Sequence, residues 1–262
     1  MTISYATTVC AGAHSGNDLK PPPQILTMFK CVMLDWGGTL TEEGSLMKKI
    51  SKEITFPFWK KLGFKGNFEE YSALEEETGK ELWDKWRKTK VVRKEDWSLI
   101  FAKKTGLRIS KEVARNEFEI FREGYRQNSK LFPDTVKTLE MLKKKGLLLA
   151  LVSNNWKGMY ELFDEYGIMK YFDVTVLSEE VGALKSGLKP FEYVLAKLNL
   201  LPKDCLMVGD KPEEDGACRK LGIKFCLVDS EGKHANETDR FDYRITKLSE
   251  LEKIIKAMVK EI

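Results

Sequence analysis

Cysteine and histidine are scarce in this sequence, which has five cysteines and two histidines among 262 residues. No two cysteines stand in a C-x-x-C pair, and so few soft metal ligands disfavour a zinc site. Cys31, Cys205 and Cys226 lie in or beside apolar stretches, where a free thiol behaves as a small apolar side chain. This usage favours a reducing setting, and we expect the protein to be cytoplasmic.

The sequence also lacks a long apolar run and a strong charge of either sign. No stretch approaches the roughly 20 apolar residues that a membrane-spanning helix requires. The 44 basic and 40 acidic residues leave a net charge of +4, so nothing indicates nucleic acid or a membrane surface as a partner. With 42% hydrophobic and 32% charged residues, the composition is that of a soluble globular protein.

The N-terminal segment, residues 1–28, has no hydrophobic period and no basic-then-apolar order, so it does not resemble a secretory signal. Its three consecutive prolines, Pro21–Pro23, indicate an extended connector. We expect residues 1–28 to be a poorly ordered extension that takes no part in any chemistry.

Residues 45–129 have helical periodicity and almost no strand signal. Asn67 and Glu70 have the spacing of a capping box, which predicts the start of a helix. Four of the six tryptophans lie in this segment, and Phe118, Phe121 and Tyr125 share one face of a further predicted helix. A helical segment this rich in aromatic residues is able to bury a small core of its own. We therefore predict that 45–129 is a helical domain inserted into a core made of 29–44 and 130–262.

Apolar runs and helical segments alternate regularly in the predicted core. The runs that we predict as strands are 31–34, 147–152, 173–177, 205–208 and 224–228. Asp134 stands where it would cap a helix that runs to Lys145, and further helices are predicted around 191–198 and 249–259. Alternation of this kind specifies an α/β fold. We predict a doubly wound parallel sheet of Rossmann-like type, carrying the inserted all-helical cap.

Polar side chains follow three of the predicted strands where each strand ends. They are Asp35, the pair Ser153–Asn154, and Asp210, and the carboxyl ends of parallel strands meet at one edge of a sheet. Two carboxylates at such close range repel unless a cation lies between them, and ligands that are all oxygen select Mg²⁺. Hydroxyl, amide and lysine groups opposite the carboxylates would hold phosphoryl oxygens. The pattern is typical of phosphoryl transfer.

From residue 29 to about 260, the sequence resembles the haloacid dehalogenase (HAD) superfamily. The first motif of that family, D-x-D-G-T, appears as D-W-G-G-T at Asp35–Thr39, and the second, a strand ending in Ser or Thr, ends at Ser153. The fourth motif, G-D-x-x-x-x-D, is Gly209–Asp215. Two lysines compete for the third motif: Lys185 fits its spacing without a gap, whereas Lys189 precedes a proline as in many members but requires a shift. We choose Lys185.

The resemblance implies a role for each matched residue. Asp35 would be the nucleophile, forming an aspartyl-phosphate, and would also bind Mg²⁺. Gly37, through its backbone carbonyl, and Asp210 would be further metal ligands, and Asp215 would support the metal site. The phosphoryl group of a small phosphorylated metabolite would be held by Ser153, Asn154 and Lys185, of which Ser153 and Lys185 would also act in catalysis. The segment 45–129 would be a C1-type cap that excludes water and selects substrate.

The first motif departs from the family pattern at Gly37, where phosphatases of the family carry an aspartate that protonates the leaving group. The loss of such a proton donor typically costs about 10²–10⁴-fold in rate. Three interpretations remain open. The chain is a phosphohydrolase that uses a good leaving group or takes its proton from the cap or the substrate; it is a phosphonate C–P hydrolase similar to phosphonoacetaldehyde hydrolases; or it is a metal-binding scaffold with little activity.

The C–P hydrolase needs a cap lysine to form an imine with its substrate. The sequence offers five candidates: Lys48, Lys49, Lys52, Lys60 and Lys61. A true dehalogenase is disfavoured, because Asp210 preserves a metal ligand that those metal-free enzymes have lost. The sequence leaves the oligomeric state open.

Overall fold

The computed structural model describes residues 29–89, 93–234 and 236–257, so the predicted N-terminal extension 1–28 lies outside the described residues. The strands are β1 (Cys31–Leu34), β2 (Leu148–Ser153), β3 (Val174–Leu177), β4 (Cys205–Gly209), β5 (Lys224–Val228) and β6 (Tyr243–Ile245). The α-helices are α1 (Gly44–Ile50), α2 (Phe56–Lys61), α3 (Phe68–Thr89), α4 (Asp96–Thr105), α5 (Lys111–Asn128), α6 (Thr135–Lys144), α7 (Met159–Glu165), α8 (Ser178–Val181), α9 (Lys189–Leu198) and α10 (Leu251–Ala257). In the described part of the chain, no helix is both long enough and apolar enough to cross a bilayer.

The six strands form one parallel sheet in the order β3-β2-β1-β4-β5-β6, which confirms the predicted α/β fold. Strand β1 pairs with β2 on one side and with β4 on the other, so that Leu34 is in register with both Leu151 and Val208. The strand order therefore reverses at β1 and β4. A doubly wound sheet opens a crevice at the carboxyl ends of the strands at this point, and ligands of such folds bind there.

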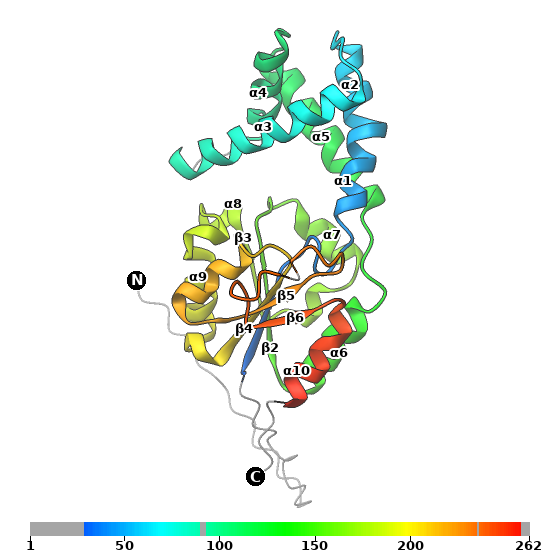
Figure 1. The fold of residues 1–262 in the computed structure, drawn as a ribbon. Coiled ribbons are helices and arrows are strands. Elements are labelled where there is room, and N and C mark those ends of the chain that lie inside the picture. Colours follow the sequence, from blue (N-terminus) through cyan, green and yellow to red (C-terminus); the bar gives the residue numbers. More distant parts are fainter. Residues whose placement is uncertain (1–28, 90–92, 235, 258–262) are drawn as a thin grey trace, which may run out of the picture.

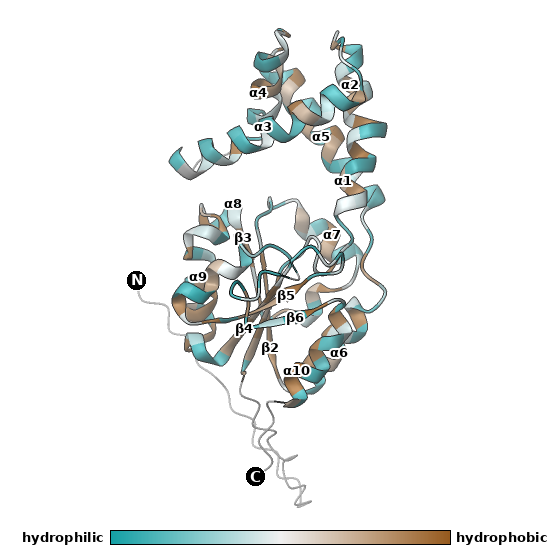
Figure 2. Ribbon diagram, viewed as in Figure 1, coloured by the Kyte–Doolittle hydropathy of each residue, from teal (hydrophilic) through white to brown (hydrophobic). Residues whose placement is uncertain are grey.

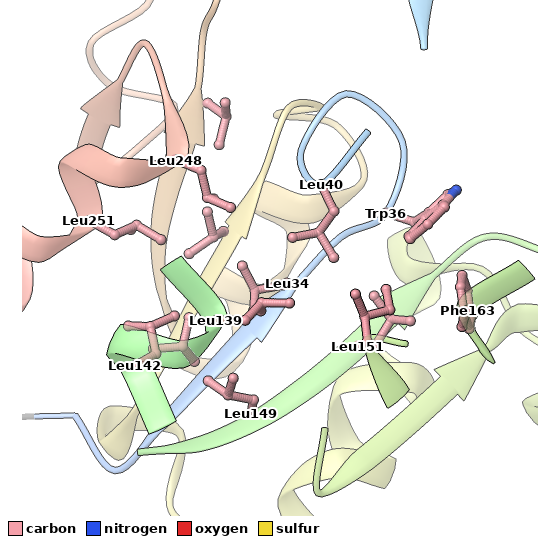
Figure 3. Packing of buried hydrophobic residues seen from close by; sticks show 14 of the residues in the cluster. Leu34, Trp36, Leu40, Leu139, Leu142, Leu149, Leu151, Phe163, Leu248 and Leu251 are labelled. Atoms are coloured by element: carbon pink, nitrogen blue, oxygen red, sulfur yellow. The ribbon is translucent and has the colours of Figure 1, made fainter. Parts of the chain in front are cut away.

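Both faces of the sheet are covered by helices, as the continuous apolar strands require (Figure 1). Alternate residues of β1 enter different clusters: Val32 and Leu34 pack on one face, and Cys31 and Met33 on the other. In Figure 3, Leu34 of the sheet lies beside Leu139 and Leu142 of α6. Figure 2 shows the same arrangement in hydropathy, with hydrophobic strands inside and mixed helices outside.

The helices α1 to α5 follow β1 in the chain and lie together above the carboxyl edge of the sheet (Figure 1). We call the segment Gly44–Asn128 the helical insert. It has an apolar cluster of its own, in which the ring centroids of Trp59 and Phe101 are 4.5 Å apart. The capping box is present, because the Asn67 N–H donates to Glu70 and the Glu70 N–H donates to Asn67, each over 2.9 Å.

One face of α5 joins the helical insert to the sheet. Phe118, Phe121 and Tyr125, which the sequence placed on one face, surround Trp156 at centroid distances of 5.7, 6.0 and 5.9 Å. The indole N–H of Trp36 also donates to the Tyr125 hydroxyl over 2.9 Å. The loop after β1 and the insert are therefore tied by a buried hydrogen bond as well as by apolar contacts.

Two local features differ from the sequence predictions. Strand β6 was missed, because three residues at a sheet edge give too short a pattern. Asp134 precedes α6, but its side chain does not cap the helix. Its carboxylate instead accepts the N–H of Ser249, a residue distant in the chain, over 2.7 Å.

Candidate active site

Asp35 lies directly after β1, at the edge of the sheet where the strand order reverses. Its backbone N–H donates to the Val208 carbonyl of β4 over 3.0 Å, which extends the strand pairing up to the acidic residue itself. Only 4% of Asp35 is exposed. The next residue, Trp36, is fully buried 4.7 Å from the Phe163 ring, so the loop after Asp35 is anchored in the core (Figure 3).

Lys185 is buried between two carboxylates. Its Nζ lies 2.6 Å from Asp35 Oδ1 and 2.5 Å from Asp215 Oδ1. Burial alone would lower the pKa of Lys185, but the charges of Asp215 and Asp35 outweigh it and raise that pKa above its ordinary value. The ammonium group is therefore charged, and it neutralises part of the negative charge collected at this edge.

Lys189, the competing residue for the third motif, is placed elsewhere. Its ammonium is exposed and donates to the Val181 carbonyl over 2.6 Å. The structure thus brings Lys185 to Asp35, and leaves Lys189 at the start of α9.

Three acidic residues gather at this edge: Asp35, Asp210 and Asp215 each offer a carboxylate oxygen within 4.8 Å of the others. Asp210 Oδ1 is buried and accepts no hydrogen bond from the described part of the chain. Burial and the neighbouring Asp35 raise the pKa of Asp210 to about 8. An all-oxygen donor set with one buried oxygen left unpaired fits a hard cation such as Mg²⁺.

Asp215 is more tightly held than Asp210. It is fully buried, and its Oδ2 accepts the Lys211 N–H over 2.9 Å. Burial raises the pKa of Asp215 to about 7, against the opposing effect of Lys185. With both oxygens engaged by Lys185 and the backbone, Asp215 orients the other groups as well as contributing charge.

Glycines let the first motif approach these acids closely. Gly38 has φ +73°, a conformation that favours glycine, and a Cβ at this position would overlap the carboxylate of Asp210. The Gly38 N–H donates to the Thr41 carbonyl over 2.9 Å, which closes the turn. Thr39 beside it is buried, and its hydroxyl is unpaired among the described residues.

Ser153 and Asn154 stand at the end of β2, as predicted, but their side chains have different surroundings. Ser153 is 3% exposed, and its hydroxyl accepts a hydrogen bond from the Asn155 amide over 2.9 Å. The Asn154 side chain connects two loops: its Oδ1 accepts the Lys185 N–H over 3.0 Å, and its Nδ2 donates to Glu214 over 2.7 Å. Asn154 thereby fixes the backbone of Lys185.

Sequence reasoning missed two acids at this edge, Glu214 and Glu43. Glu214 lies inside the fourth motif, but no local pattern links it to Asn154. Glu43 directly precedes α1, and its carboxylate lies against Gly37, the position at which the first motif departs from the family pattern. The only sequence signal for Glu43 was an acid at a helix start, which ordinarily indicates favourable interaction with the helix dipole.

Comparison with known proteins places this geometry in a family. The chain is 31% identical over 137 residues to a glyceraldehyde 3-phosphate phosphatase of Methanocaldococcus jannaschii, covering 50% of this chain and 58% of that protein. It is 32% identical over 127 residues to a phosphoglycolate phosphatase of Aquifex aeolicus, covering 46% and 60%. The chain thus spans somewhat over half the length of these relatives.

Solved structures match over most of the chain. A crystal structure of a HAD phosphatase from Thermococcus onnurineus, 26% identical, superposes with a TM-score of 0.65 and covers 88% of this chain and all of that one. The sequence pattern of haloacid dehalogenase-like hydrolases matches residues 29–222. This match contains Asp35, Lys185, Asp210 and Asp215, and the chain belongs to the haloacid dehalogenase-like hydrolase family.

Proposed function

We propose that the protein is a Mg²⁺-dependent phosphohydrolase that acts on a small phosphorylated metabolite through an aspartyl-phosphate on Asp35. The observation that carries the proposal is the buried Asp35 carboxylate, which lies beside Lys185 and shares a sheet edge with the unpaired oxygen of Asp210. The names of the relatives, which are phosphatases of small phosphorylated compounds, support the same class of reaction.

In this proposal one Asp35 oxygen attacks phosphorus while the bond to the leaving oxygen breaks. Lys185, the Ser153 hydroxyl and the Asn154 backbone hold the phosphoryl oxygens and stabilise their charge. Asp35, Asp210 and the Gly37 carbonyl would hold the metal, with Asp215 supporting the site. When bound, Mg²⁺ supplies positive charge that offsets the repulsion between the acids and the phosphoryl group.

We further propose that residues 45–129 form a cap over the site and that 29–44 and 130–262 form the core. The support is the position of the helical insert above the carboxyl edge of the sheet (Figure 1). Asp35 and Asp210 belong to this edge, because they directly follow β1 and β4. Its attachment through Tyr125 to Trp36, the residue after Asp35, would couple movement of the cap to the site.

The structure gives less support to the C–P hydrolase alternative. A lysine that forms an imine is normally desolvated, because burial favours the neutral amine. The five candidate lysines in the helical insert are all exposed: Lys48, Lys49, Lys52, Lys60 and Lys61. Treatment with borohydride and phosphonoacetaldehyde should therefore label none of them.

The proposal is tested with p-nitrophenyl phosphate, acetyl phosphate, glyceraldehyde 3-phosphate and phosphoglycolate, each with Mg²⁺ and with EDTA. We expect metal-dependent turnover that Asp35→Asn abolishes. The matched control is Asp164→Asn, the same chemical change at an exposed position of α7, which should keep full activity. Acid quenching with ³²P-labelled substrate should leave label on the wild-type protein and none on Asp35→Asn. Absence of metal-dependent turnover of all four compounds would instead favour the scaffold interpretation.

A further inference from the structure

The carboxylate of Glu43 occupies the space into which a side chain at position 37 would extend. Three of its atoms, Cδ, Oε1 and Oε2, crowd the point where a Cβ of residue 37 would stand, and the farthest of them, Oε1, is 2.5 Å away. Gly37 is not among the residues with positive φ, so its backbone would accept another residue. A side chain at position 37 would therefore have to displace the Glu43 carboxylate, the end of a flexible side chain, and would meet no conflict with the backbone conformation.

Glu43 reaches this place from a different element. It is the residue immediately before α1, the first helix of the helical insert, and its carbonyl accepts the Met47 N–H over 2.8 Å. Its side chain is 25% exposed, and Oε2 lies 3.6 Å from the ammonium of Lys211. The carboxylate is thus held next to the first motif and still reachable by a ligand from the solvent side.

We propose that Glu43 is the acid–base residue of this enzyme, in place of a side chain at position 37. This inference depends on the proposed function. As Asp35 attacks phosphorus and the phosphorus–oxygen bond of the substrate breaks, the electron pair stays on the leaving oxygen, which takes a proton from the Glu43 carboxyl group. The Glu43 carboxylate then takes a proton from water as the water oxygen attacks phosphorus, and the bond to Asp35 breaks with its electron pair returning to Asp35.

This assignment makes the site complete without a second acid in the first motif. The Glu43 carboxyl group occupies the space that the side chain of an acid at position 37 would fill. Glu43 reaches this space from the start of the helical insert, and Gly37 leaves room for it because it has no side chain. Since Glu43 precedes α1 directly, a movement of the insert would also move the proton donor.

The test compares leaving groups in Glu43→Gln, a nearly isosteric change. For an alkyl phosphate such as phosphoglycolate, kcat/KM should fall by about 10²–10⁴-fold, because the leaving alkoxide needs a proton. For p-nitrophenyl phosphate, kcat/KM should fall by less than about tenfold, because p-nitrophenolate leaves without one. Glu42→Gln, the same change at the preceding exposed residue, should alter neither value.

A second set of variants exchanges the two positions. Glu43→Ala should lose alkyl phosphatase activity, and Gly37→Asp added to Glu43→Ala should restore much of it, because the vacated space then accepts the aspartate. Gly37→Asp alone should give little gain, since the new carboxylate takes the space of the Glu43 carboxylate and so replaces one acid with another. Calorimetric titration with Mg²⁺ should give affinities within about threefold of wild type for Glu43→Gln.

The outcomes separate the two proposals. Equal losses for alkyl and aryl substrates, no loss for either, or a large loss of Mg²⁺ affinity in Glu43→Gln would each overturn the assignment of Glu43 while leaving the phosphohydrolase intact. Wild-type protein without metal-dependent turnover would overturn the proposed function, and the assignment of Glu43 with it. The assignment is supported if the Glu43 variants lose activity only toward alkyl phosphates and if Gly37→Asp restores that activity in Glu43→Ala.

Discussion

The ammonium of Lys185 lies 2.6 Å from the carboxylate of Asp35, although 150 positions separate the two residues in the chain. Both groups are almost completely removed from solvent. A charge buried in this way depends on its partner, because removal of the partner leaves the remaining charge without solvation.

We therefore expect Lys185→Met to lower the free energy of unfolding in EDTA by about 3–5 kcal/mol, since Asp35 and Asp215 then face each other without a cation. Urea unfolding measures the change. Lys189→Met is the matched control, because this lysine is exposed and makes one hydrogen bond to a backbone carbonyl. It should cost about 1 kcal/mol or less. Similar losses in the two variants would contradict the buried ion pairs.

Much of this site was predictable because strand ends are visible in sequence. One four-residue apolar run is followed by Asp35, and another is followed by Gly209 and Asp210. These runs specify two acids at one sheet edge once the strands are parallel. Lys185 followed from the spacing of the third motif, which the resemblance to the HAD superfamily supplied. The prediction of the two acids needed only local patterns and the general geometry of parallel sheets.

Contacts that depend on the meeting of distant loops were not predictable in this way. Glu43 meets Gly37, and Glu214 meets Asn154, through the relative placement of segments for which the sequence has no periodic signal. Asp134 shows the same limit, because its carboxylate has an ordinary capping position but binds Ser249. Short polar side chains take whichever partner the tertiary structure brings near.

A double-mutant cycle can measure the hydrogen bond between Asn154 and Glu214. Asn154→Asp keeps an acceptor for the Lys185 N–H but sets a carboxylate against Glu214, whose Oε2 is the present partner of Nδ2 at 2.7 Å. We expect Asn154→Asp to destabilise the protein and Glu214→Gln to relieve this loss in the double variant. The coupling energy from urea unfolding should be about 1 kcal/mol or more. Effects that add within about 0.5 kcal/mol would show that the bridge contributes nothing in solution.

Replacement of Gly38 should lower both the free energy of unfolding and the affinity for Mg²⁺. In Gly38→Ala, the positive φ costs about 1–2 kcal/mol, and the added methyl group must displace the Asp210 carboxylate. We expect the free energy of unfolding to fall by at least this amount and Mg²⁺ affinity, measured calorimetrically, to fall by about tenfold or more.

Gly79 is the matched control for this change. It lies inside α3, and no atom lies within 4 Å of the position that an added methyl group would take. Gly79→Ala should therefore raise stability by about 0.5–1 kcal/mol and leave Mg²⁺ affinity unchanged. Equal Mg²⁺ affinities of Gly38→Ala and Gly79→Ala would contradict this prediction. They would mean that metal binding does not require the close approach of Gly38 to Asp210.

The buried Glu117 in the helical insert should make the free energy of unfolding depend on pH. It is 4% exposed and accepts a hydrogen bond from the Ser98 hydroxyl over 2.9 Å, and burial raises its pKa from 4.5 to about 7. Between these pH values the folded protein binds more protons at this residue than the unfolded chain does. The contribution of Glu117 to the free energy of unfolding is therefore fully present below pH 4.5 and falls as the pH rises to about 7.

Glu117→Gln removes this dependence, because the amide stays neutral while it retains an acceptor for Ser98. We expect the variant to match wild type within about 1 kcal/mol at about pH 4 and to exceed its free energy of unfolding by up to about 3 kcal/mol at about pH 8. Urea unfolding at a series of pH values gives the difference curve. Glu112→Gln, exposed in the first turn of the same helix, should give a flat curve. A flat curve for Glu117→Gln as well would mean that Glu117 is solvated, and that α5 packs less closely against α4 than the buried Ser98 contact implies.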